Sequence, residues 1–242
     1  MTAILQCNAL SKSFGSVVVA DAIDFSISNG EALGIIGPNG AGKTSLFNLI
    51  TGTLQPDSGQ IVFRNKNITA LDSASRCRNG IARSFQIPQP FAAMSVYENV
   101  LVAATHGARQ GTQRAQATSI DALQKTGLFS RVNDLAGSLT LLERKRLELT
   151  RALASNPSLL LLDEIAGGLT DNECQALIQT IQDIRSTGVT IVWIEHVVHA
   201  LLAVVERLIV LDFGKVIADG DPHTVINSAV VQENYMGLAA DA

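Results

Sequence analysis

Residues 32–52 read ALGIIGPNGAGKTSLFNLITG and carry the strongest signal in the chain. The apolar segment Leu33–Ile36 predicts a short buried strand, and a helix is expected to begin near Lys43. Between them, Gly37–Thr44 fits the pattern G-x-x-x-x-G-K-T. A strand, a glycine-rich loop and a helix in this order are typical of a phosphate-binding loop, and a chance glycine-rich turn would not place all three correctly.

Each residue type in this loop has a physical task. Glycines at positions 37, 40 and 42 let the backbone turn its N–H groups inward around phosphates, where a Cβ atom would clash. The following helix directs its positive N-terminus at the same anion. Lys43 would reach the β- and γ-phosphates, and the Thr44 hydroxyl would bind Mg²⁺. The sequence therefore predicts that ATP or GTP is bound by Gly37, Pro38, Asn39, Gly40, Ala41, Gly42, Lys43, Thr44 and Ser45.

A second apolar segment, SLLLLDE at Ser158–Glu164, ends in two adjacent carboxylates. A continuous apolar run of this length is typical of a parallel strand that is buried on both faces. Ligands of such sheets bind beyond the carboxyl ends of the strands. Asp163 is therefore a candidate for the Mg²⁺ shell, and Glu164 a candidate for orienting or deprotonating a water molecule. The alternative is an ordinary strand end.

Two further polar residues follow predicted strands. His196 comes after VTIVWI at Val189–Ile194, with Glu195 between them. A histidine at a strand end is more often packed or exposed than catalytic, but this one lies one strand after the Asp-Glu pair and could sense the γ-phosphate. Gln86 follows the predicted strand Ile81–Phe85 and could contact Mg²⁺ or water.

Composition narrows the class of protein. The chain has 242 residues, 47% hydrophobic residues and a net charge of −4. It is long enough for one large domain or for a core with a small subdomain. The negative charge argues against a nucleic-acid partner. No clean apolar run of about 20 residues and no signal peptide are visible, so we expect a cytoplasmic protein that meets a membrane only through partners. Its three scattered cysteines are expected to be reduced.

Together these segments resemble the nucleotide-binding subunit of an ATP-binding cassette (ABC) transporter. GPNGAGKT corresponds to the Walker A motif, SFQ to the Q-loop, LLLLDE to the Walker B strand and EH to the switch histidine. The resemblance implies that the ligand is ATP with Mg²⁺ and that Thr44, Gln86 and Asp163 hold the metal ion. It implies that Phe14 stacks on adenine, that Glu164 is the catalytic base and that His196 stabilises the transferring phosphate. Gln86 would couple the site to the membrane domain.

The stretch SLTLLERKRLELTR, residues 138–151, takes the place of the family's signature. In the family this helix end completes the ATP site of the opposite subunit when two cassettes close head to tail. The resemblance therefore assigns that contact to Thr140, Leu141, Leu142 and Glu143.

The family's signature is close to Leu-Ser-Gly-Gly-Gln, and the sequence departs from the usual family pattern at several positions. Leu142 replaces the second signature glycine, and Glu143 replaces a glutamine. Ile165 follows the Walker B glutamate where proline is usual, and Thr170 stands where many members carry the D-loop aspartate. These differences concern the contact across the dimer rather than the fold.

The signature stretch can also be interpreted from its residues alone. Thr140-x-x-Glu143 is a capping box, in which the glutamate side chain reaches back to the Thr140 N–H. Arg144 with Glu148, and Glu148 with Arg151, have the spacing of ion pairs along a helix. The alternative to a phosphate-facing helix end is a capped surface helix without a ligand.

Several segments narrow the branch of the family. RSFQIPQPFAAMSVYENVLVAA at Arg83–Ala104, the signature variant, EIAGGLT and the near-terminal ENYMG resemble the ATP-binding subunits of importers for branched-chain or other hydrophobic amino acids. That branch includes urea and amide importers, and the lipopolysaccharide-export ATPases share much of the frame. A soluble ABC protein acting on ribosomes or DNA is a further alternative, as is a non-hydrolysing nucleotide binder, although the latter would be expected to lose Glu164 or His196.

The resemblance also implies the partners and the location. They are a second cassette, identical or different, two membrane-spanning permease subunits and, indirectly, a periplasmic or extracellular binding protein. The chain would then lie peripherally at the cytoplasmic face of the cell membrane.

The expected fold is α/β: a P-loop NTPase core of ABC ATPase type. Residues 3–36 are expected to form a small N-terminal antiparallel β subdomain. Residues 1–86 and 156–242 form the core with this subdomain and the C-terminal tail, and residues 87–155 form an inserted helical subdomain. Gly107–Gln116 is polar and reads as a loop or a frayed helix. Gly214, Gly220 and Pro222 predict a hairpin followed by a final helical tail.

Overall fold

A computed structural model describes residues 2–229 and 231 of the chain. It divides into two compact units, which comprise residues 1–72 with 192–242 and residues 73–191. The segment ENYMG, which contributed to the assignment of the branch, lies outside the described residues.

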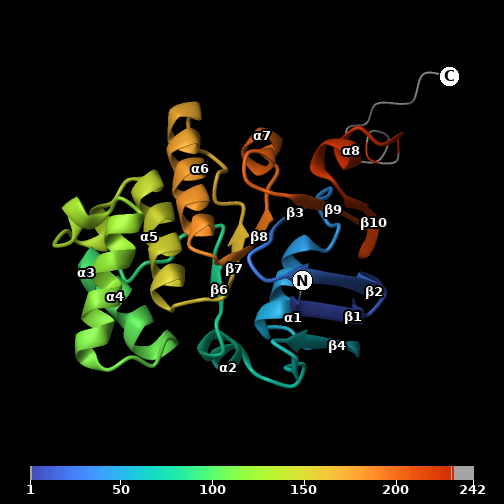
Figure 1. The fold of residues 1–242 in the computed structure, drawn as a ribbon, viewed down its shortest axis with the longest axis horizontal. Helices are drawn as coiled ribbons and strands as arrows, with labels where there is room; N and C mark the ends of the chain where they lie inside the picture. Colours follow the sequence, from blue (N-terminus) through green and yellow to red (C-terminus); the bar gives the residue numbers. More distant parts are fainter. Residues whose placement is uncertain (1, 230, 232–242) are drawn as a thin grey trace. The chain divides into compact units, whose positions relative to one another are not determined.

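The first unit contains an antiparallel sheet with the strand order β2-β1-β4-β5. β1 and β2 form a long hairpin in which Phe14 pairs with Val17 (Figure 1). The antiparallel sheet predicted for residues 3–36 was incomplete, because β4 and β5, which follow the phosphate loop in the chain, also belong to it. It was also too long, because residues 32–36 pair elsewhere. The four strands are β1 (Ala3–Phe14), β2 (Val17–Ser28), β4 (Ser58–Phe63) and β5 (Lys66–Asn67).

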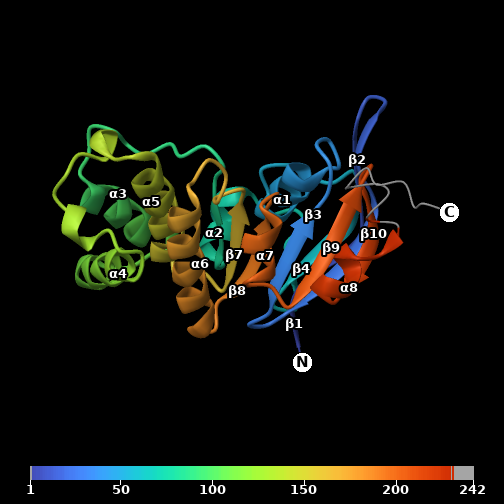
Figure 2. The same ribbon diagram turned by 90° about the horizontal axis from the view of Figure 1, so that it is seen from above.

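The first unit also holds the strand that leads into the phosphate loop. This strand, β3, pairs in parallel with β9, and β9 pairs antiparallel with β10 (Figure 2). All five residues of β3 are buried, as expected for a strand covered on both faces. The predicted hairpin at Gly214 is confirmed as β9–β10. The elements are β3 (Ala32–Ile36), α1 (Lys43–Thr51), α7 (Val198–Leu202), β9 (Arg207–Asp212), β10 (Lys215–Gly220) and α8 (Pro222–Ile226).

In the second unit, β6 pairs in parallel with β7, the strand that carries Asp163. Every residue of β7 is buried, which confirms the prediction made from its continuous apolar run. The strand β8 contains the boundary between the two units. These elements are α2 (Ser73–Arg78), β6 (Ile81–Ser84), β7 (Leu159–Asp163), α6 (Asp171–Ser186) and β8 (Thr190–Ile194).

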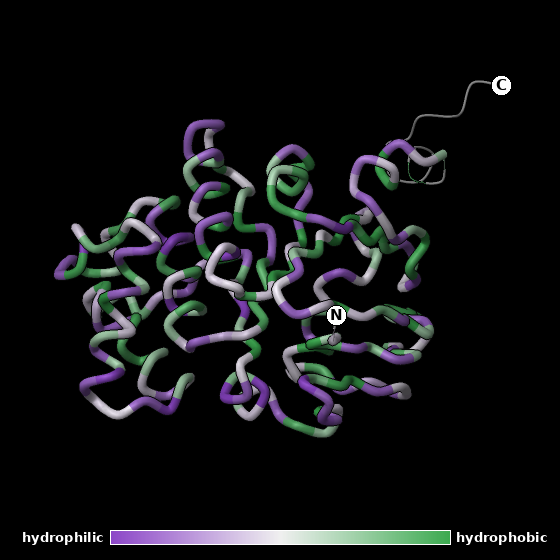
Figure 3. The backbone as a smooth tube through the Cα atoms, in the orientation of Figure 1, coloured by the Kyte–Doolittle hydropathy of each residue, from purple (hydrophilic) through white to green (hydrophobic). Residues whose placement is uncertain are grey.

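The remainder of the second unit is helical and has its own apolar core, centred on Val96, Val100, Leu123 and Leu147. Hydrophobic and hydrophilic residues alternate along its helices, as amphipathic packing requires (Figure 3). Within Gly107–Gln116, for which a loop or a frayed helix is expected, η1 ends at Gly107 and α4 begins at Thr112. The elements are α3 (Val96–Val102), η1 (Ala103–Gly107), α4 (Thr112–Lys125), η2 (Phe129–Arg131), η3 (Ala136–Ser138) and α5 (Leu141–Ala154).

Among the described residues, no helix is both long and apolar enough to span a bilayer. The three cysteines form no disulfide with one another; Cys7 and Cys174 are buried and Cys77 is partly buried.

Candidate nucleotide-binding and hydrolysis site

The phosphate loop lies in the first unit between β3 and α1, where the sequence predicts it. Lys43 folds back across the loop, and its Nζ donates to Gly37 O at 2.7 Å and to Pro38 O at 3.0 Å. The loop is closed further by the Ala41 N–H, which donates to Pro38 O at 3.2 Å. The ammonium group is thus held within the loop that would surround the phosphates.

Two of the loop glycines are required by close backbone approaches. A Cβ atom at position 37 would lie 2.1 Å from Leu211 O, and one at position 42 would lie 2.3 Å from Val19 O. Gly42 also has φ 102°, in the left-handed region that favours glycine. No side chain fits at either position without moving backbone, so both glycines are needed for the loop's shape.

The remaining loop residues are at or near the surface. Asn39, Gly40 and Thr44 are exposed, and Pro38 and Ser45 are partly buried. Thr44 at the start of α1 is exposed, and the N-cap of this helix, Gly42, makes no side-chain hydrogen bond to its first turn. A helix N-terminus of this kind favours an anion.

Phe14 ends β1 in the first unit and is 53% exposed. The Nζ of Lys12 lies 5.5 Å from the centre of its ring, and the same ammonium pairs with Asp57 at 2.6 Å. The ring therefore has an accessible surface on which a base could stack.

His196 follows β8 and has a side chain that is 58% exposed, whereas the Glu195 side chain before it is fully buried. The Glu195 carboxylate accepts hydrogen bonds from the His196 N–H at 3.0 Å and the Val197 N–H at 3.3 Å. Nδ1 of His196 lies 3.6 Å from the same oxygen. Glu195 therefore fixes the turn that presents the imidazole, a role that the sequence analysis did not assign.

In the second unit, Asp163 ends β7 as a buried carboxylate. Nη2 of Arg83, which is equally buried on the adjacent strand β6, donates to Asp163 Oδ2 at 2.5 Å. Arg83 was not predicted from the sequence, because in IARS it reads as an ordinary charged residue and its partner becomes apparent only once β6 pairs with β7.

Glu164 and Gln86 meet beside this ion pair. Nε2 of Gln86 donates to Glu164 Oε2 at 2.5 Å, so residues separated by 78 positions in the chain are joined by a hydrogen bond. The Glu164 backbone has φ 47°, which is uncommon for a residue other than glycine. The second unit thus brings together Gln86, Asp163 and Glu164, three residues that the sequence singled out.

The predicted capping box at the start of α5 is confirmed. The Glu143 N–H donates to Thr140 Oγ1 at 3.3 Å, and Glu143 Oε2 accepts from the Thr140 N–H at 2.9 Å. The Thr140 N–H, more than any other group, lowers the pKa of Glu143. Leu141 is half exposed and Leu142 partly buried. The helix N-terminus is therefore capped from within, with an apolar side chain at its tip.

Only one of the two ion pairs expected along α5 is present. Arg151 pairs with Glu148 at 2.7 Å, but Arg144 donates to Gly137 O at 2.9 Å instead of binding Glu148.

The donor set suits a small hard cation. In the second unit, the Gln86 amide oxygen and the Asp163 carboxylate are oxygen donors, the kind that Mg²⁺ prefers, and the Thr44 hydroxyl of the first unit is a donor of the same kind. The buried carboxylate of Asp163 keeps a second oxygen, Oδ1, beside the one that binds Arg83. The residues present therefore fit this ion.

Residues 20–167 match the ABC transporter family, and the chain belongs to that family. It is an ATP-binding and ATP-hydrolysing cassette of α/β fold, as the motifs predict.

Similar proteins cover almost the full chain. The high-affinity branched-chain amino acid transport ATP-binding protein LivG of Escherichia coli strain K12 is 32% identical over 98% of both chains. The lipopolysaccharide export system ATP-binding protein LptB of Haemophilus influenzae is 34% identical over 97% of both chains. The ADP conformation of MJ1267, an ATP-binding cassette of an ABC transporter, superposes with a TM-score of 0.88 at 29% identity, covering 98% of this chain and 100% of that one.

Proposed function

We propose that this chain powers an importer for branched-chain or other hydrophobic amino acids by binding and hydrolysing ATP. The observation that carries the proposal is the full-length similarity to LivG, together with the branch-specific stretch Arg83–Ala104. Import of urea or amides would use the same cassette design.

Lipopolysaccharide export is the second candidate, and it is supported by a specific observation. LptB of Haemophilus influenzae is 34% identical, a similarity comparable to that of LivG. A soluble ABC protein acting on ribosomes or DNA is less well supported, because the chain carries a net charge of −4.

In the proposed chemistry, residues of this chain bind the phosphates and the adenine, orient the catalytic carboxylate and accept a proton from water. The phosphate loop with Lys43 binds the β- and γ-phosphates, and Phe14 stacks on adenine. Glu164 accepts the proton of the attacking water, while Gln86 orients its carboxylate, as their hydrogen bond suggests. His196 donates a hydrogen bond to the transferring phosphate.

Thr44, Gln86 and Asp163 are the residues proposed to hold Mg²⁺. The ion, when bound, neutralises charge on the β- and γ-phosphate oxygens. Arg83 then serves as the counter-charge of the buried Asp163 carboxylate at the end of β7, since a buried charge needs a partner of opposite sign.

The start of α5 is proposed to complete the site of a second cassette, identical or different. Of Thr140, Leu141, Leu142 and Glu143, the backbone N–H groups of Leu141 and Leu142 would bind an anion at this helix N-terminus. The capping box limits the proposal to these two groups, because the Thr140 N–H donates to Glu143 Oε2 and the Glu143 N–H donates to Thr140 Oγ1.

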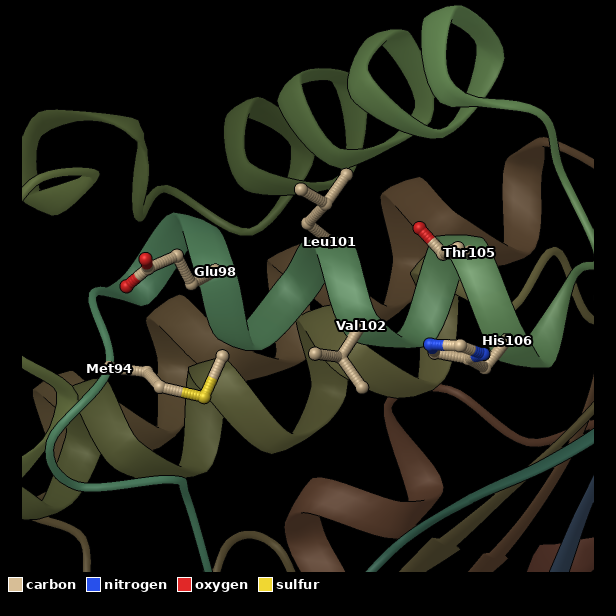
Figure 4. A pocket seen from close by; sticks show the side chains of 6 residues that line it. All are labelled: Met94, Glu98, Leu101, Val102, Thr105 and His106. Carbon is tan, nitrogen blue, oxygen red and sulfur yellow. The ribbon is translucent and has the colours of Figure 1, made fainter.

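The second unit carries a candidate surface for two permease subunits. A cavity of about 230 Å³ is lined by Met94, Glu98, Leu101, Val102, Thr105 and His106, all from α3, η1 and the preceding turn (Figure 4). Close by in sequence, Phe85, Ile87 and Phe91 are 54%, 70% and 46% exposed. We propose that the stretch Ile87–Val102 receives a coupling helix. The chain would then lie on the cytoplasmic face of the cell membrane, with a substrate-binding protein on the other side.

Transport assays test the proposed substrate. The chain is reconstituted in vesicles with the permeases encoded beside it and their binding protein, and ATP-dependent uptake of labelled leucine, isoleucine and urea is measured. Leucine and isoleucine uptake supports the proposal. Uptake of urea alone, or release of lipopolysaccharide by a partner set without a binding protein, contradicts it.

A pair of charge substitutions tests the docking surface. Phe91→Glu should leave the ATPase activity of the isolated chain intact and abolish its stimulation by the permease. Phe129→Glu is the matched control, because Phe129 is in the same unit and is also 46% exposed. Equal stimulation of both variants would remove Phe91 from the docking surface.

A further inference from the structure

Lys145 is a buried lysine in the second turn of α5, two residues after Glu143. It is only 5% exposed, although it carries an ammonium group. Its Nζ donates to Gly167 O at 2.5 Å and lies 3.4 Å from Glu164 O. Both acceptors are backbone carbonyls of the segment that connects β7 to α6. A buried ammonium is stable only where such acceptors surround it, so Lys145 is bound tightly to this segment.

The segment that Lys145 contacts has an unusual backbone. Glu164 is left-handed at φ 47°, a conformation that persists in a non-glycine residue only when its surroundings hold it. Gln86 binds the side chain of Glu164, and Lys145 faces its carbonyl. The side chain and the main chain of Glu164 thus each have a partner.

A second contact joins the same helix to the same segment. The Cδ2 atom of Leu141, in the first turn of α5, lies 3.7 Å from the position that a Cβ atom on Gly168 would take. Leu141 and Lys145 are four residues apart and therefore lie on one side of the helix. The first two turns of α5 therefore lie beside residues 164–168.

From these contacts we infer that Lys145 is a positioning residue: it fixes the backbone of Glu164 and ties the orientation of that carboxylate to the N-terminal end of α5. This inference rests on the proposed role of Glu164 as the base and of the α5 end as a contact for a second nucleotide. A shift of α5 when that nucleotide binds would move Lys145, and with it the carboxylate that activates water in the chain's own site.

The test uses the full-length chain with Lys145→Met, which keeps an unbranched side chain and removes the ammonium. Lys125→Met is the matched control, because Lys125 lies in the same unit with a side chain that is 43% exposed. Turnover, KM, equilibrium ATP affinity and melting temperature are measured for each. We expect the kcat of Lys145→Met to fall at least about tenfold, while ATP affinity changes less than about twofold, since the phosphate loop is untouched. Lys125→Met should match the wild type.

A double-mutant comparison separates positioning from stability. If Lys145 acts through Glu164, adding Lys145→Met to Glu164→Gln should not lower the residual turnover further. An additional loss equal to that of the single variant would overturn the inference, as would a kcat for Lys145→Met within about twofold of the wild type. If Lys145→Met does not fold, Lys145→Gln gives the same comparison. Near wild-type turnover in Glu164→Gln would instead overturn the proposed role of Glu164.

Discussion

Replacing Arg83 by methionine tests how the second unit stabilises the carboxylate at the end of β7. Arg83 and Asp163 form an ion pair whose side chains are only 6% and 5% exposed. Removing one partner of a buried pair leaves an uncompensated charge and typically costs about 3–5 kcal/mol. Arg83→Met should therefore lower the free energy of unfolding by about that amount when metal and nucleotide are absent.

The control is a surface ion pair in the same unit. Lys125 binds Asp121 at 2.7 Å, but their side chains are 43% and 58% exposed, so solvent screens the interaction. Lys125→Met should cost less than about 1 kcal/mol. Adding Asp163→Leu to Arg83→Met should recover part of the loss, because no charge is then left buried.

Urea denaturation followed by circular dichroism measures these differences. The double variant should be more stable than Arg83→Met alone. A loss of less than about 1 kcal/mol for Arg83→Met, equal to that of Lys125→Met, would show that the buried Asp163 carboxylate does not need Arg83 as its counter-charge.

Three other predictions address base stacking, the signature helix and pH. Phe14→Ala should weaken ATP binding by roughly 1–3 kcal/mol and Phe14→Trp should not, whereas equal affinities in a titration would make Phe14 a turn residue. Leu142→Gly should leave turnover of the assembled transporter level or slightly lower, and a rise of about tenfold would show that leucine obstructs the site. The N-cap backbone N–H groups lower the pKa values of Glu98, Glu143 and Glu173 below 4.5. Their stabilisation is thus present above about pH 4.5 and is lost as the pH falls through the folded-state values. The triple glutamine variant should show a flatter fall in melting temperature below that pH, and an unchanged fall would contradict this.

Much of the site could be predicted because its elements are local. The phosphate loop, the capping box at Thr140 and the buried strand before Asp163 each depend on a few neighbouring residues whose spacing decides the structure. The family resemblance then supplied the expected roles of Gln86 and His196, which local patterns alone would not assign.

The missed features depend on contacts between distant segments. The strand β4 follows α1 in the chain and pairs with β1 in the N-terminal sheet, and no pattern in residues 3–36 predicts this pairing. Arg83, Glu195 and Lys145 read as ordinary charged residues in the sequence, because their partners become apparent only once the strands pair and α5 packs. A buried charge is recognised by its environment, and the environment is tertiary.

Glu164→Gln tests the central claim, that this cassette hydrolyses ATP with Glu164 as its base. Binding of labelled ATP and steady-state turnover are measured on the same preparation, with Lys43→Ala as the variant expected to lose binding. We expect an affinity within about threefold of the wild type and a turnover lower by at least about 100-fold, because the phosphate loop remains while the water loses its base. Turnover near the wild-type value would contradict this claim.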